Sequence, residues 1–111
     1  MSVETRLIIT YISLLVIDEK FSEAERAIDI VHATHIRERL LRANIKKLHA
    51  MCLMKQKNPK INESYKQLKE ASKLFENESA RLQQNSDGNL GMALCNFGMG
   101  WLMFTKLEYF A

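Results

Sequence analysis

The chain has 111 residues, 47% of them hydrophobic, and a formal net charge of +3 at pH 7. A chain of this length forms one domain or part of one, and its apolar content is too high for intrinsic disorder. With one proline and four glycines, it contains few residues that interrupt helices. We therefore expect residues 1–111 to form a single all-α domain.

The spacing of apolar residues predicts about five helices. In the first of them, Ile8, Ile12 and Leu15 recur at intervals of three or four residues, which places them on one face of a helix. Ser22 and Glu25 match the capping box that often begins a helix, and residues 85–88 have the composition of a turn. The expected helices cover residues 3–17, 22–31, 36–55, 62–84 and 89–104.

The cysteines and the two most apolar runs indicate the compartment. Cys52 and Cys95 stand within apolar helical patterns, so we expect buried, reduced thiols in a cytoplasmic or nuclear protein. The apolar run at residues 7–17 is shorter than the ~20 residues that span a bilayer. The run at residues 90–104 is also too short, and Asn96 interrupts it. The sequence therefore predicts a soluble intracellular protein with no membrane-spanning segment.

The most specific spacing lies in the last predicted helix. Leu94, the pair Phe97-Gly98 and Trp101 follow one another at intervals of three residues. This order resembles the first helix of a tetratricopeptide repeat, W-x2-L-G-x2-Y, and the resemblance implies antiparallel helix pairs stacked into a short superhelix. The glycine would let the next helix approach the backbone closely.

The resemblance is uneven along the chain. The glycine position is filled by Ile12, His49 and Gly98, whose separations all exceed the 34 residues of the standard repeat. Residues 106–111 look like a turn and the first residues of a further helix, so the chain is expected to end within its last repeat. A plain antiparallel helical bundle fits the same periodicity.

Positive charge is concentrated in the middle of the chain. Residues 32–73 carry a net charge of +8, whereas residues 1–31 carry −3 and residues 74–111 carry −2. Basic residues at helical spacing can hold an acidic peptide or a phosphate backbone, although a solvated lysine surface is the more ordinary explanation. Nucleic acid is the weaker candidate, because Tyr65 is the sole interleaved aromatic and no binding signature is present. The two basic stripes are Arg39, Arg42 and Lys46, and Lys66, Lys69 and Lys73.

Metal binding and catalysis find little support in the sequence. His32 and His35, and likewise His49 and Cys52, stand three residues apart, but no third or fourth ligand is placed beside either pair. There is no glycine-rich phosphate loop, no G-x-S-x-G and no H-E-x-x-H. We therefore expect a non-enzymatic protein without a metal or another cofactor.

The leading hypothesis is a protein–protein interaction scaffold. In the repeat family that the chain resembles, the first helix of each pair lines a concave groove, which binds a peptide or helical segment of a partner. The groove would then be formed by the first, third and fifth helices, and an acidic segment would suit the basic stripe of the third. The predicted partner-binding residues are Arg39, Arg42, Lys46, His49 and Asn96.

An alternative hypothesis rests on the same last helix, which is apolar and has almost no charge. It predicts an exposed apolar patch through which two copies of the chain associate, unless the helix is buried under the third and fourth helices. A third hypothesis is nucleic-acid binding by the basic residues. The predicted interface residues are Phe97, Trp101, Phe104 and Tyr109.

Overall fold

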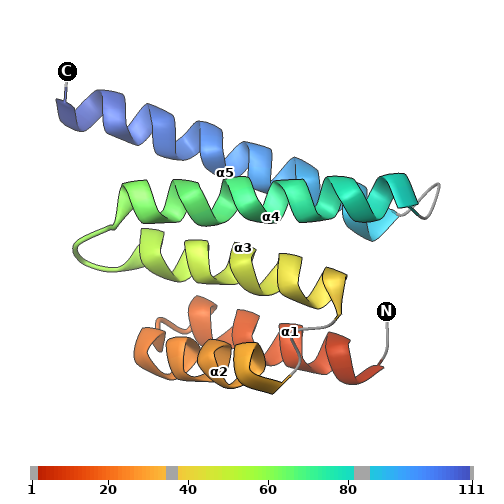
Figure 1. The fold of residues 1–111 in the computed structure, drawn as a ribbon. Coiled ribbons are helices and arrows are strands. Elements are labelled where there is room, and N and C mark those ends of the chain that lie inside the picture. The colour runs from red at the N-terminus through yellow and green to blue at the C-terminus, as the bar shows by residue number, and fades with distance from the viewer. Residues whose placement is uncertain (1–2, 35–37, 82–85, 111) are drawn as a thin grey trace.

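The fold is all-α, as expected. The computed structural model describes residues 3–34, 38–81 and 86–110, and these residues form five helices and no strand (Figure 1). None of these helices is both long enough and apolar enough to cross a membrane. In chain order, the helices are α1 (Val3–Ile17), α2 (Phe21–Thr34), α3 (Arg39–Lys55), α4 (Ile61–Arg81) and α5 (Ser86–Phe110).

The first turn shows how α1 is joined to α2. Glu19 has a φ of 61°, in the left-handed region that usually favours glycine. The amide of Lys20 donates to the carbonyl of Leu15 and the amide of Glu19 donates to that of Val16, which is the hydrogen-bond pattern of a Schellman motif. Glu25 accepts a hydrogen bond from Gln56 Nε2 at 3.0 Å. The sequence placed Glu25 in a capping box at the start of α2. In the structure, its carboxylate links α2 to the end of α3.

Helix α5 is longer than predicted at both ends. It begins at Ser86, so residues 86–88 belong to the helix and not to the expected turn; Asn85 lies outside the described residues. It continues to Phe110, and the turn expected at residues 106–110 is therefore wrong. No glycine or proline follows Gly100 in the sequence, so nothing there favours a break in the helix.

The helices are stacked in series (Figure 1). Helix α3 contacts α1 and α2 on one side and α4 and α5 on the other, while the described parts of α1 and α2 make no contact with α4 or α5. A closed bundle around one core would bring α1 and α2 against the later helices. The contacts therefore favour a stack of helix pairs, and the chain extends over 42 × 30 × 20 Å.

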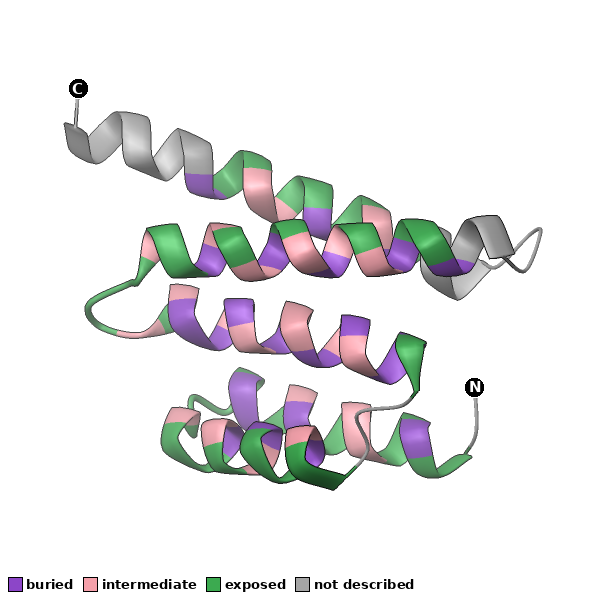
Figure 2. Ribbon diagram, viewed as in Figure 1, coloured by how far each residue is buried: buried purple, intermediate pink, exposed green. Residues whose placement is uncertain are grey.

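The core of the described residues lies on both sides of α3. Every residue from 40 to 54 is buried or half-buried (Figure 2). On one side, Leu41 and Ile45 pack against Ile12 and Ile28 of the first helix pair. On the other side, the apolar residues of α3 pack against α4 and α5. This second cluster consists of Leu40, Ala43, Ala50, Leu68, Ala71, Phe75, Cys95 and Leu102.

Candidate functional site

A groove runs along α3 between α1 and α5. It comprises two adjoining cavities of about 270 and 570 Å³, which share Lys47 and Leu94. Helices α1, α3 and α5 supply its lining residues, with one residue from α4. These are the helices that the sequence assigned to a groove. We call this surface the groove throughout.

The position of α3 between two core clusters explains which of its residues reach the groove. Asn44, Lys47, Met51 and Met54 recur at intervals of three or four residues, so they share one face of the helix. This face lies between the face that packs on the first helix pair and the face that packs on α4 and α5. It therefore remains open even though the rest of α3 is largely covered.

One end of the groove is apolar. Phe97 is 75% exposed, Trp101 57% and Leu94 46%, although all three line the larger cavity. Exposed aromatic side chains grouped in this way are uncommon on a monomeric protein surface and mark interaction sites. The flexible thioether side chains of methionines adapt to partners of different shape. We call this the apolar end, and its main lining residues are Ile17, Met51, Met54, Phe97 and Trp101.

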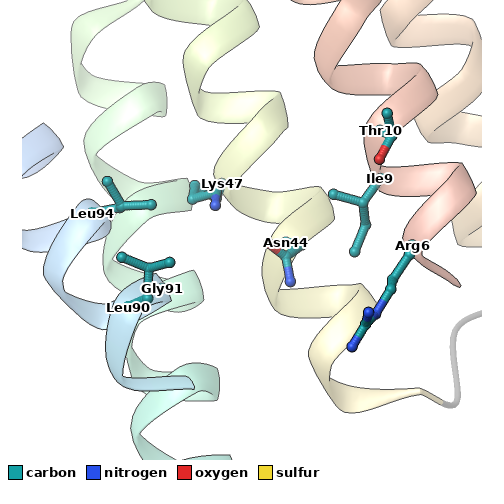
Figure 3. A pocket seen from close by; sticks show the side chains of 8 residues that line it. All are labelled: Arg6, Ile9, Thr10, Asn44, Lys47, Leu90, Gly91 and Leu94. Atoms are coloured by element: carbon teal, nitrogen blue, oxygen red, sulfur yellow. The ribbon is translucent and has the colours of Figure 1, made fainter. Parts of the chain in front are cut away.

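The other end of the groove carries two cationic side chains beside apolar ones such as Ile9, Leu90 and Leu94. Figure 3 shows Arg6 and Thr10 of α1 on one side of the smaller cavity and Leu90 and Leu94 of α5 on the other, with the α3 side chains between them. Asn44 uses one amide hydrogen to bind the Leu40 carbonyl oxygen at 2.9 Å. We call this the cationic end, defined by Arg6, Asn44 and Lys47.

Lys47 lies at the junction of the two ends. Its Nζ atom lies 5.9 Å from the centroid of the Phe75 ring, which is fully buried. Burial lowers the pKa of the Lys47 amine, because the charged form is partly removed from water. Burial also raises the pKa of the nearby Cys95 thiol to about 11, so that thiol is neutral at pH 7.

Neither cation of the groove has an acidic partner within the described part of the chain. The two ion pairs found there are Lys20 with Asp18, and Lys46 with Glu70. Among the described residues, no aspartate, glutamate or histidine lines either cavity. The described lining therefore offers positive charge and apolar surface to a bound molecule.

The basic residues predicted to line the groove lie elsewhere on α3. Lys46 Nζ donates to Glu70 Oε2 of α4 at 2.7 Å. Burial and the nearby charges of Lys46, His49 and Arg42 lower the pKa of His32 in α2, so these three side chains lie near α2, and none of them lines either cavity. Their placement in the groove is wrong; their role in partner binding stays a prediction. We call Arg42, Lys46 and His49 the basic face of α3.

The helical repeat explains this error. At 100° per residue, Arg42 and His49 lie about half a turn around the axis from the stripe formed by Lys47, Met51 and Met54. Both stripes border the apolar positions of α3, so sequence alone did not decide which would face the groove. The sequence feature that was missed is the stripe formed by Asn44, Lys47, Met51 and Met54, which begins with polar residues and ends with apolar ones.

The remaining predicted partner-binding residues are also outside the groove. Arg39 is exposed in the first turn of α3. Asn96 is exposed on α5, and its Oδ1 accepts a hydrogen bond from Ser72 Oγ of α4 at 3.4 Å. Neither residue lines a cavity of the groove.

The predicted interface residues are only partly described. Phe97 and Trp101 are exposed, so of the two arrangements that the sequence left open, burial of these two under α3 and α4 is excluded. The side chains of Phe104 and Tyr109 lie outside the described residues. The close neighbour of Gly98 is α4, the preceding helix, because an added Cβ would lie 2.9 Å from Leu68 Cδ1. The expected approach of a following helix is therefore not what this glycine accommodates.

A second apolar surface lies outside the groove. The outer surface of α1 and α2 exposes Leu7, Tyr11, Leu14 and Ile30, and a cavity of about 380 Å³ lies between these helices.

Within the described ranges, no three histidine, cysteine or acidic side chains are grouped as a metal site; His35 is not among the described residues. The two cysteines are buried, free thiols.

Comparison with known proteins gave no relative. No protein-family model matches the chain, and no curated protein or solved structure matches it. The resemblance to tetratricopeptide repeats therefore stays a prediction from the sequence.

Proposed function

We propose that this chain is a non-enzymatic interaction domain that binds an apolar or amphipathic segment of a partner protein in the groove. The observation that carries the proposal is the grouping of Phe97, Trp101 and Met51 around one open cavity of about 570 Å³. Apolar surface removed from water contributes about 25 cal/mol per Å², so a segment that covers these side chains gains affinity from burial alone.

The dimensions of the groove suit a short helix or strand. From Asn44 to Met54, the open stripe of α3 rises about 15 Å along the helix axis, at 1.5 Å per residue. A bound helix of about three turns would match this length. Grooves of this kind hold amphipathic helices by residues at helical spacing on one face.

The stacking of the helices supports a scaffold related in architecture to tetratricopeptide repeats. Helices α1, α3 and α5 line the groove, as the first helices of successive pairs would, while α2 and α4 lie behind them. The buried free thiols of Cys52 and Cys95 suit a reducing compartment, so we place this function in the cytoplasm or the nucleus.

A second function is supported by the same patch. Two copies of the chain associating through α5 would cover Phe97 and Trp101 with equal gain from burial. Light scattering over a concentration series separates the two proposals. A dimer that Trp101→Glu dissociates supports assembly, whereas a monomer at all concentrations leaves the groove open for another protein.

Selection from a random library of displayed 16-residue peptides tests the groove proposal. Enriched peptides are expected to share large apolar residues at helical spacing and to lose binding to Met51→Glu. Tyr11→Glu is the matched control, because it adds the same charge on the exposed outer surface of α1. No enrichment over the bare support, or equal loss of binding in both variants, would overturn the proposal.

A further inference from the structure

The two ends of the groove differ in chemistry, and the difference follows the direction of the helices. Helices α1, α3 and α5 run in the same direction (Figure 1). Along α3, Asn44 and Lys47 come first and Met51 and Met54 follow. Along α1, Arg6 lines the first cavity and Ile17 the second, with Ile9, Thr10 and Ser13 between them. The two cations of the described lining therefore lie toward the beginning of these helices and the aromatic residues toward the end of α5, while apolar residues line the groove throughout.

We propose that the groove binds its partner segment in one direction, with acidic side chains at the cationic end and large apolar side chains at the apolar end. This inference rests on the proposed function and adds the charge and the orientation of the bound segment. The occupant is an amphipathic segment of another protein, about three helical turns long, whose acidic residues are confined to one terminal turn.

Lys47 carries most of the argument. It lines both cavities, rests over the ring of Phe75, and has no carboxylate partner among the described residues. An apolar side chain placed over Lys47 would remove its charge further from water without supplying a counter-charge, which is unfavourable. A carboxylate at the same place would form a charge-assisted hydrogen bond. The best occupant of this position is therefore acidic.

Arg6 extends the same preference to the mouth of the groove. It lies on α1 at the edge of the smaller cavity, across from Leu90 and Leu94 of α5 (Figure 3). Arg6 and Lys47 are the charged residues among the described side chains that line the two cavities, and both are cations. Since none of these described lining residues is acidic, a basic partner segment would meet only like charge among them.

Three peptides that differ only in one terminal turn test the charge preference. Each is a 14-residue amphipathic helix without tryptophan and with the same leucine face, and its first turn carries two Glu, two Gln or two Lys. The chain contains one tryptophan, Trp101, which lines the groove, so its fluorescence reports occupancy. At low salt we expect the Glu peptide to bind at least tenfold more tightly than the Lys peptide, with the Gln peptide between them.

Variants of the chain assign this preference to the cationic end. Lys47→Met is expected to remove most of the difference between the Glu and Gln peptides while the Gln peptide still binds. Lys69→Met, on the exposed surface of α4, is the matched control and should leave the difference unchanged. If Lys47→Met fails to fold by circular dichroism, Arg6→Gln replaces it, with a smaller expected effect of the same sign.

Photo-crosslinking tests the orientation. A benzophenone at the end opposite the two Glu residues is expected to label Met51 or Met54, as mapped by mass spectrometry, and the label should be lost when it is moved to the acidic end. Equal affinity of all three peptides, or labelling from both ends, would overturn this inference while leaving the proposed function intact. Failure of all three peptides to bind would overturn both.

Discussion

Lys47 Nζ lies 5.9 Å from the centroid of the Phe75 ring. A residue of the groove in α3 thus rests on a fully buried residue of α4. The ring of Phe75 also fills the space where a side chain of Gly91 in α5 would lie, because an added Cβ would be 2.5 Å from its Cδ1. Contacts of one ring therefore connect α3, α4 and α5 beside the cationic end.

Alanine at two glycines of α5 tests this contact. Gly91→Ala is expected to lower the free energy of unfolding, because overpacking against Phe75 costs about 1–3 kcal/mol and exceeds the helix gain of alanine. Gly100→Ala is the control, since no atom lies within 4 Å of its added Cβ, and it should stabilise by about 0.5–1 kcal/mol. Urea denaturation measures both. Equal effects of the two substitutions would contradict the packing described.

Truncation of two phenylalanines tests the division between core and groove. Phe75 is fully buried, whereas Phe97 is mostly exposed. We expect Phe75→Ala to lower the free energy of unfolding by about 3–5 kcal/mol, because it leaves a cavity. Phe97→Ala should change it by less than about 0.5 kcal/mol, as is usual at the surface. A large destabilisation by Phe97→Ala would show that Phe97 belongs to the core and would remove it from the groove.

The ion pair between Lys46 and Glu70 gives a pH-dependent contribution to stability. The hydrogen bond from Lys46 lowers the pKa of the Glu70 carboxyl, so its contribution is present above the ordinary pKa and is lost as the pH falls through the lowered one. Glu70 is 41% exposed, so Glu70→Gln should cost less than about 1 kcal/mol at pH 7.

Urea denaturation at pH 7 and pH 3 checks this contribution. The difference in free energy of unfolding between the wild type and Glu70→Gln should shrink at the lower pH. Glu76→Gln is the control, because Glu76 is exposed on the same helix. A difference that grows as the pH falls would contradict the assigned ion pair.

The two cysteines are expected to react slowly with thiol reagents in the folded protein. Burial raises the pKa of both thiols, that of Cys95 to about 11, and the thiolate is the reactive form. Reaction with an aromatic disulfide reagent at pH 8 should accelerate strongly in urea, and Cys52→Ser and Cys95→Ser assign the two phases. A native rate equal to the rate in urea would contradict the burial of that cysteine.

Much of the fold could be predicted from the sequence. The apolar periodicity gave five helices, and the predicted bounds of α1 agree with the structure. The sequence left open whether Phe97 and Trp101 are exposed or buried under α3 and α4, and the structure exposes both. The assignment of α1, α3 and α5 to one groove followed from the resemblance to a repeat family.

The details that failed depend on tertiary contacts. Helix α3 has neighbours on two sides, so two of its faces are apolar and two stripes with polar residues lie between them. Periodicity locates these stripes but does not tell which neighbour each one meets. The basic stripe containing Arg42 and Lys46 was therefore assigned to the groove, which in fact is lined by Asn44 and Lys47. The charges alone favoured the wrong stripe, since it holds more cations.

Methionine methyl resonances give the most direct test of the groove. The chain contains six methionines, of which Met51 and Met54 line the groove. Met54, Met92 and Met99 all pack against the core between α3, α4 and α5, but Met92 and Met99 line neither cavity. With ¹³C-methyl methionine, titration of the acidic amphipathic peptide should shift the signals of Met51 and Met54 and leave those of Met92 and Met99 in place. Binding that shifts only Met92 and Met99, or that moves none of these four signals, would contradict a partner site between α1, α3 and α5.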